Sequence, residues 1–393
     1  MAVFLLIIGL VLFVGLVLIH EWGHFIVARR NGVDVEEFGL GFPPRAFGRK
    51  TKGDKPFILS VNWLPLGGFV RLKGEHDADT GKGTFGAASL GVKTKIMVAG
   101  VVMNLAVALV LFTILAWVGM PKLIPNQYTV KSDTTVTRND VLAGDVQKGS
   151  PAAMMGLQAR DHLVAIAPVN QPGKAQQVTS SDDLPNITKD FAGQKVVVTY
   201  TRAGQTQNGT TTLLTKKVVQ DSKNTSNPKG YLGISPADYS LQRSTWSAPI
   251  VALGLTKQIT LLTFQGLGSA LKGLGSAVAG IVTGNSAERK QGQTQASSQV
   301  SGPVGIFVIL KDGSALGPQL MLMIVAIISL TLAIMNILPI PALDGGKIFV
   351  TLIARLFHKK VSRNVEDWVY GTSFAFLLGL IVLITIVDVK RFF

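Results

Sequence analysis

Four long apolar segments constrain the fold of this 393-residue chain more than any other feature. A helix needs about 20 mostly apolar residues to cross a bilayer, and we predict transmembrane helices at 1–28, 96–120, 320–346 and 368–389. Hydrophobic residues make up 47% of the chain and charged residues 16%, a balance that favours a membrane protein. The first segment lacks a basic start and a small-residue cleavage site, so we expect a retained helix and no cleaved signal peptide.

The net charge of +15 is explained better by membrane topology than by nucleic-acid binding. Twelve Lys and Arg residues lie in 29–95, between the first two predicted helices, and a second basic loop lies between the last two. Because short basic loops stay in the cytoplasm, we expect both loops inside and both chain termini outside, together with the long segment 121–317. We expect no nucleic-acid partner.

The loop 29–95 contains a predicted β-hairpin. The stretches FILSVNW and GFVRLKG flank Leu66-Gly67-Gly68, which predicts a tight turn and a hairpin over 57–73. An ordinary cytoplasmic loop is the alternative, because Gly-Gly marks turns of many kinds.

A polar segment follows the second predicted helix and has the length of a single small domain. Residues 130–236 contain strand-like stretches and the sequence KGSPAAMMGLQARDHLVAI, with a Ser-Pro-Ala helix start, Gly156 at the helix end and Asp161 before a strand. This pattern resembles an α+β PDZ domain of the bacterial, protease-associated kind. A generic small β-rich domain is the alternative.

Two further segments precede the third predicted helix. Residues 249–283 mix apolar residues with Lys and Gln, and an even number of spans keeps both basic loops on one side, so we predict an amphipathic helix lying at the membrane interface. Residues 284–302 are rich in Gln and Ser, which predicts a flexible linker.

The sequence HEWGH lies near the inner end of the first predicted helix. His20 and His24 are one helical turn apart on one face, the spacing with which two imidazoles bind zinc, and Glu21 is positioned to act as a general base. Placing an ionisable side chain within a membrane span costs about 2.5 to 3.5 kcal/mol, so these three side chains would be unfavourable there without a binding partner. The alternative is that these side chains reach the cytoplasmic face at the helix end.

A catalytic zinc site needs a third protein ligand, and the chain has no cysteine to supply it. Pro339 and Pro341 break the third predicted helix, and irregular backbone at membrane depth is tolerated where it is buried or lines a wet cavity. Asp344 follows this break at a depth similar to that of the two histidines, because the first and third spans run in the same direction. Asp344 could instead cap a helix.

These motifs together resemble the site-2 protease family of intramembrane zinc metalloproteases, in its bacterial regulator of sigma-E protease (RseP-like) branch. The resemblance rests on HEWGH, on NILPIPALDGG from Asn336 to Gly346, on PLGGFV, AGVVMN and SGPVGI, and on a PDZ-like segment. Relatives often carry two PDZ domains in tandem, whereas the length here allows one, and Val101 stands where many relatives have Pro.

The resemblance implies Zn2+ bound by His20, His24 and Asp344, with Glu21 as the catalytic base. It also implies that the hairpin is membrane-associated and presents an edge strand to substrate. The residues expected to contact substrate are Asn336, Gly67, Gly68, Phe69 and Asn104; close helix packing is the alternative role for Asn104.

The implied function is hydrolysis of peptide bonds in or near the transmembrane segments of single-span proteins, such as anti-sigma factors or remnant signal peptides. The implied location is the bacterial cytoplasmic (inner) membrane, with the active site toward the cytoplasm and the PDZ domain outside, where it would bind trimmed substrate termini. One alternative is a catalytically idle membrane scaffold whose PDZ domain binds partner carboxyl termini. Another is a membrane zincin that cleaves soluble peptides in an open chamber.

Overall fold

The computed structural model describes residues 2–202, 204–225, 228–298, 302–358 and 361–392. The chain forms two compact units. The helical unit comprises residues 1–114 and 248–393, and the inserted unit comprises residues 115–247. Each unit is described separately below.

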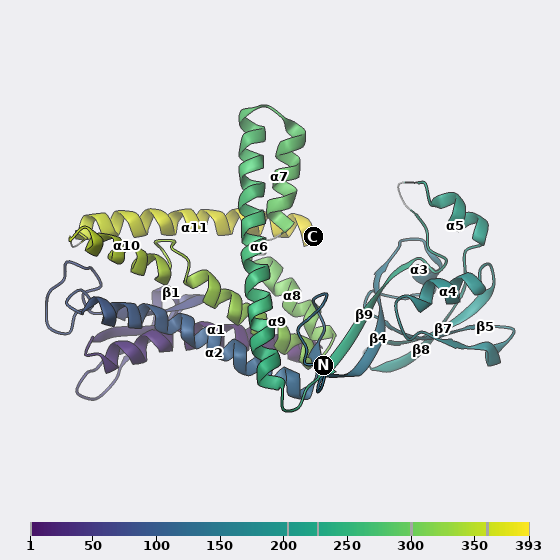
Figure 1. Cartoon of the computed structure of the whole chain (residues 1–393), viewed down its shortest axis with the longest axis horizontal. Coiled ribbons are helices and arrows are strands. Elements are labelled where there is room, and N and C mark those ends of the chain that lie inside the picture. The colour runs from purple at the N-terminus through teal and green to yellow at the C-terminus, as the bar shows by residue number, and fades with distance from the viewer. Residues whose placement is uncertain (1, 203, 226–227, 299–301, 359–360, 393) are drawn as a thin grey trace. The chain divides into compact units, whose positions relative to one another are not determined.

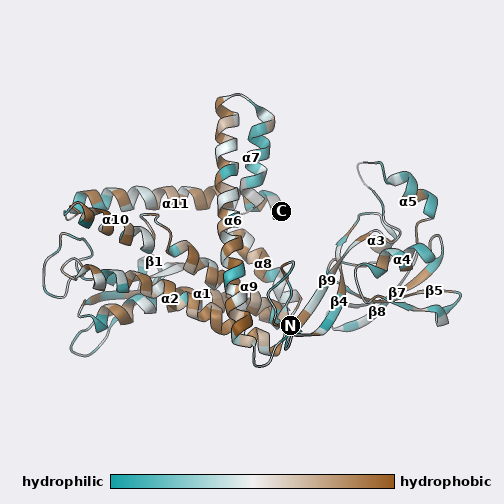
Figure 2. Cartoon of the chain, in the orientation of Figure 1, coloured by the Kyte–Doolittle hydropathy of each residue, from teal (hydrophilic) through white to brown (hydrophobic). Residues whose placement is uncertain are grey.

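The helical unit consists mainly of helices and contains one small sheet (Figure 1). Its elements are α1 (Ala2–Arg30), β1 (Val35–Lys50), β2 (Ile58–Leu72), α2 (Leu90–Val118, whose last residues belong to the inserted unit), α6 (Ala248–Val282), α7 (Ser286–Ser298), α8 (Pro303–Ala315), α9 (Pro318–Asn336), α10 (Asp344–Leu356) and α11 (Arg363–Phe392). Apolar residues dominate α1, α2, α9 and α11, as Figure 2 shows by colour.

Each predicted transmembrane segment coincides with a long apolar helix: α1, α2, α9 and α11 are long and apolar enough to cross a membrane. The described part of the chain contains one more helix that meets the same criterion, α6. The predicted end of the third segment, 320–346, is wrong, because α9 ends at Asn336. The two prolines lie in the turn that follows, where neither has to fit inside a helix.

The predicted hairpin over 57–73 is wrong. Both of its expected strands belong to the single strand β2, and part of β1 lies between them. Glu37 pairs with Ile58 on one side and with Arg71 on the other, so 37–40 separates 58–61 from 68–72. The second half of β1 pairs with 58–62. Gly67 has a φ of +90°, so it bends β2 where a turn had been expected.

The predicted flexible linker 284–302 is also wrong over most of its length, because Ser286–Ser298 form helix α7. The helix packs closely on α6 through small residues. A Cβ added at Gly292 would lie 2.4 Å from the Ala277 nitrogen, and one added at Gly280 would lie 2.4 Å from the Arg289 nitrogen. The packing of these backbones outweighs the polar composition that had indicated a linker. Residues 299–301 of that segment lie outside the described residues.

Helix α8 was not predicted as a separate element. Its start is tied to α11 by Asp388, a buried carboxylate that accepts hydrogen bonds from the backbone nitrogens of Gly302 and Gly305, each at 2.8 Å. An anion at a helix start is favourable because the first backbone N–H groups lack partners within the helix. The contact gives a structural role to the SGPVGI motif, whose Ser301 lies outside the described residues.

The inserted unit is an α+β module built on one sheet with strand order β3-β9-β4-β5-β7-β8, with β6 beside β5. Its elements are β3 (Met120–Pro121), β4 (Thr135–Val146), α3 (Pro151–Met154), β5 (His162–Pro168), η1 (Pro172–Lys174), β6 (Gln176–Gln177), α4 (Asp183–Asp190), β7 (Lys195–Arg202), β8 (Gln205–Thr212), α5 (Lys216–Ser222) and β9 (Ile234–Arg243).

The Ser-Pro-Ala motif of the inserted unit starts a helix as expected. The Ser150 hydroxyl accepts a hydrogen bond from the Ala153 nitrogen at the start of α3, and Gly156 follows the helix with a φ of +83°. Asp161 precedes β5 and is buried, where Arg202 donates two hydrogen bonds to its carboxylate. The sequence pattern therefore predicted the local structure correctly.

Candidate metal centre

Two glycines let α1 and α2 approach closely around the two histidines. A Cβ added at Gly23 would lie 2.7 Å from the Ala99 carbonyl oxygen. One added at Gly100 would lie 2.5 Å from Nε2 of His24 and 2.6 Å from Cε1 of His20. Real Cβ atoms do not approach other atoms this closely, so a side chain at position 100 would displace both imidazoles.

The atoms available for metal binding converge on one point. Nε2 of His20 and Nε2 of His24 are 3.1 Å apart, and the Asp344 Oδ2 atom lies 3.1 Å from the first and 3.2 Å from the second. Both histidines are buried and Asp344 is half-buried. His20 and Asp344 are 324 positions apart in the chain.

These separations and donor types fit zinc. Two imidazole nitrogens and one carboxylate oxygen form a known catalytic zinc ligand set. Ligand atoms about 2.0 to 2.1 Å from a tetrahedral ion lie roughly 3.3 Å from one another, close to the observed spacing. Among the described residues, this is the group of His, Asp and Glu side chains with the geometry to hold a metal ion.

The orientation of His24 also suits a ligand. Its Nδ1 atom lies 2.7 Å from the Ile96 carbonyl oxygen on α2, so Nδ1 carries the proton and donates it. The lone pair of the imidazole is then on Nε2, the atom that faces His20 and Asp344. Metal-bound histidines in proteins are oriented in this way by a hydrogen bond from the other ring nitrogen.

Asp344 is held in place by the turn between α9 and α10. It is the first residue of α10, where a carboxylate is favourable. A Cβ added at Gly345 would lie 2.2 Å from the Ile337 carbonyl oxygen, and one added at Gly346 would lie 1.9 Å from that of Ile340. Only residues without a side chain allow the start of α10 to pack so tightly against this turn, and the two glycines thereby fix the position of the carboxylate.

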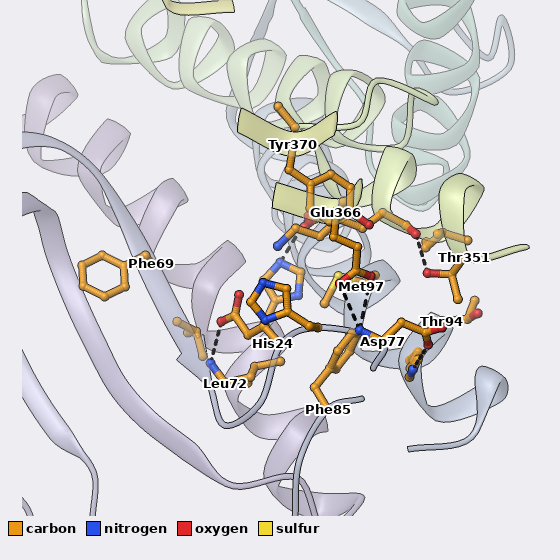
Figure 3. Close-up of a pocket in the computed structure, with 18 of the residues that line it drawn as sticks. His24, Phe69, Leu72, Asp77, Phe85, Thr94, Met97, Thr351, Glu366 and Tyr370 are labelled. Atoms are coloured by element: carbon orange, nitrogen blue, oxygen red, sulfur yellow. Dashed lines mark hydrogen bonds and ion pairs between the residues drawn. The ribbon is translucent and has the colours of Figure 1, made fainter. Parts of the chain in front are cut away.

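Two of the three candidate ligands, His24 and Asp344, line a cavity of about 620 Å³ together with Glu21. Figure 3 shows His24 facing this cavity, with Phe69 and Leu72 of β2 and Glu366 and Tyr370 of α11 in the same lining. Glu21 is the neighbour of His20 in sequence and shares the cavity with the other two ligands, so it can act on a water molecule or substrate held there.

The part of the cavity around Asp77 is lined by polar side chains. These residues were not among those predicted from the sequence. Lys93 donates to the buried Asp77 carboxylate at 2.5 Å, and Arg355 donates to it at 2.9 Å. Burial raises the pKa of Asp77, but the hydrogen bond and charge of Lys93, together with Arg355, outweigh burial and hold the pKa below its ordinary value. The Asp77 nitrogen donates to Glu366 at the start of α11. The acidic run GEHDAD was the available sequence signal.

The residues predicted to contact substrate fall in different places. Phe69 lines the cavity, and Gly68 lies beside it, because a Cβ at Gly68 would be 3.4 Å from Cγ of Glu21. Gly67 and Asn336, the last residue of α9, are not among the described residues that line the cavity. Asn104 is 1% exposed and contacts His20.

The fold and site together have the features of a membrane-embedded metallopeptidase, with a His-Glu-x-x-His helix and a distant carboxylate as candidate ligand. The model of Peptidase family M50 matches residues 8–380. The chain therefore belongs to this family, the site-2 proteases.

Similarity to individual proteins extends over nearly the whole chain. It is 30% identical to "Putative zinc metalloprotease CPE1693" of Clostridium perfringens, over 98% of each chain. It is 23% identical to "Zinc metalloprotease RasP" of Shouchella clausii, over 96% of this chain and 97% of the relative. It is 24% identical to "Probable protease eep" of Enterococcus faecalis, over the same shares. The predicted zinc metalloprotease activity is confirmed at the level of the family.

Proposed function

We propose that this protein hydrolyses peptide bonds in or near the transmembrane segments of single-span membrane proteins, with zinc bound by His20, His24 and Asp344. The observation that carries the proposal is the convergence of the ligand atoms of these three side chains, within 3.2 Å of one another, next to a cavity that is lined by Glu21, His24 and Asp344. Zinc in such a site supplies Lewis acidity, which polarises the scissile carbonyl and acidifies a water molecule.

Glu21 moves the proton in the proposed reaction. Its carboxylate takes a proton from water as the water attacks the carbonyl carbon, and it later delivers that proton to the leaving amine nitrogen. The two histidines and Asp344 stay in place because α2 and the turn after α9 hold them. Glu21 alone can therefore carry out both proton transfers of the hydrolysis.

The strand next to Glu21 is suited to hold an unwound substrate. Residues 68–72 pair with 35–40 on one side, and among the described residues they have no strand partner on the other. Phe69, Val70 and Leu72 of this segment line the cavity. A helical substrate hides its carbonyls in internal hydrogen bonds, and pairing with an open strand edge replaces the bonds lost on unwinding. Asn336 is the candidate to bond the substrate backbone from α9.

The contact between Asp344 and the histidines supports the proposed topology. The ligands lie near the end of α1 and just after α9, so these two helices must run in the same direction through the membrane. If α6 crossed the membrane once, α9 would start on the opposite face and run in the direction opposite to α1. Figure 1 shows α6 running across the direction of α1, α2 and α11, which favours the interfacial position predicted for 249–283. Four spans then place both basic loops in the cytoplasm and the active site toward the cytoplasm, in a bacterial inner membrane.

The inserted unit is proposed to be a PDZ domain on the outer side that binds trimmed substrate termini. Its α+β architecture supports this role, as do the Ser150-capped helix, Gly156 and Asp161. Anti-sigma factors and remnant signal peptides are the proposed substrate classes, because both are short chains with one apolar span.

The purified protein in liposomes would test the proposed function. Two single-span probes would share their flanks, one with a span of Leu and Ala and one with Gly, Ser and Asn within the span; casein would serve as a soluble substrate. We expect cleavage inside the Gly-rich span, mapped by mass spectrometry, and at least about tenfold slower cleavage of the Leu-Ala span, because unwinding a stable helix in lipid costs several kcal/mol. Casein cleaved as fast as the Gly-rich probe would favour the open-chamber zincin, and no cleavage of any substrate would favour the idle scaffold.

A further inference from the structure

The side chain of Asn104 lies behind His20 on the side away from the candidate ligand atoms. Its Nδ2 atom is 3.3 Å from Nδ1 of His20. Its Oδ1 atom is buried and has no hydrogen-bond partner among the described residues. A buried acceptor without a partner is unfavourable, so this orientation of the amide leaves the oxygen unsatisfied.

The protonation that a metal-bound histidine requires determines which way the Asn104 amide is oriented. An imidazole that binds a metal through Nε2 carries its proton on Nδ1, so Nδ1 of His20 must be a donor. An amide NH2 facing that N–H would put two donors together. Oxygen and nitrogen of an Asn amide have nearly the same shape and are assigned from their hydrogen bonds. Exchanging them lets the Nδ1 proton of His20 bond to Oδ1 and gives the orphaned oxygen its partner.

We propose that Asn104 is a positioning residue that holds His20 in the Nδ1-protonated tautomer and presents the Nε2 lone pair to the metal. This role rests on the proposed function of the site. With it, α2 orients both histidines, one through the Ile96 carbonyl and one through the Asn104 amide. The spacing of the contacts follows from helix geometry: residues 96, 100 and 104 are successive turns of one face of α2.

Simple helix packing does not account for the side chain. The packing contact at this position uses the backbone, because the Ser329 hydroxyl of α9 donates to the Asn104 carbonyl oxygen at 2.8 Å. A smaller apolar residue could make that contact equally well. A direct role in substrate binding is disfavoured by the burial of the side chain and by its position outside the lining of the cavity.

The test is the zinc dissociation constant of the purified protein, measured by competition with a chelator of known affinity. Asn104→Leu removes the acceptor and keeps the branching at Cγ, and we expect zinc affinity to fall about 10- to 100-fold, the range found when such a supporting hydrogen bond is lost. Asn104→Asp keeps an acceptor for the Nδ1 proton, and we expect its affinity to stay within about threefold of wild type or to exceed it. Thr113→Val, which removes a hydroxyl bonded within α2 to the Leu109 carbonyl oxygen, is the matched control and should leave zinc affinity unchanged.

The outcomes separate this role from the proposed function. Equal affinities for wild type and Asn104→Leu would overturn the positioning role while the zinc site stands, and so would equal losses in the Leu and Asp variants, which indicate a packing defect. A wild-type protein that binds no zinc would overturn the proposed function itself. If Asn104→Leu shows no thermal unfolding transition, Asn104→Ala replaces it with the same expected loss.

Discussion

Glu21→Gln should abolish peptide hydrolysis and leave zinc bound. The substitution keeps the size of the side chain but removes the group that takes a proton from water, and general base catalysis contributes about 10²- to 10⁴-fold. We therefore expect cleavage of the Gly-rich single-span probe to fall at least about 100-fold. Zinc content should remain that of wild type, because Glu21 is not among the three converging ligands.

Glu36→Gln is the matched control for this experiment. Glu36 is exposed on β1 and is not among the residues that line the cavity, so its variant should cleave the probe at the wild-type rate. Undiminished cleavage by Glu21→Gln would assign the proton transfer to another group. Loss of zinc from that variant would instead mean that Glu21 supports the metal.

Gly100→Ala should weaken zinc binding at least about tenfold without unfolding the protein. The added methyl carbon would lie 2.5 Å from Nε2 of His24 and 2.7 Å from Nε2 of His20, so both ligand atoms must move from the position they share with Asp344. Overpacking of this kind costs about 1 to 3 kcal/mol in stability, but misplaced ligands affect the metal far more. We expect at least about a tenfold loss of zinc affinity and a parallel loss of cleavage.

Gly91→Ala provides the control on the same helix. An added Cβ there meets nothing within 4 Å, and Ala is the better helix former by up to about 1 kcal/mol. Zinc affinity and activity should be unchanged, and the thermal midpoint should be equal or slightly higher. A Gly100→Ala protein that binds zinc as tightly as Gly91→Ala would contradict the close approach of α2 to the two imidazoles.

The sequence indicates candidate site residues most directly where the chemistry is local. His20, Glu21 and His24 follow from one helical turn, and Asp344 follows from the absence of cysteine and from the broken helix before it. Residues so far apart could be proposed as one site because the predicted direction of the spans places them at a similar depth in the membrane. Confinement to a bilayer thus supplied a distance constraint that a soluble chain would not have offered.

Features that depend on tertiary packing were not predictable in the same way. Composition marked 284–302 as a linker, but contacts between small residues of α6 and α7 make most of it helical. The Gly67-Gly68 pair suggested a turn, whereas the strand 35–40, which inserts between the two halves of β2, decides the sheet order. The contact between Asn104 and His20 depends on the register of α1 against α2, and no single-helix pattern reveals it.

The zinc content of the purified wild-type protein, measured beside that of Asp344→Ala, tests the central claim most directly. Asp367→Ala is the control, because Asp367 also lines the cavity but its carboxylate binds His76, away from the ligands. We predict about one zinc ion per chain in wild type and in Asp367→Ala, and loss of that ion from Asp344→Ala because two imidazoles alone hold zinc weakly. Full retention of zinc by Asp344→Ala would contradict the metal centre described here.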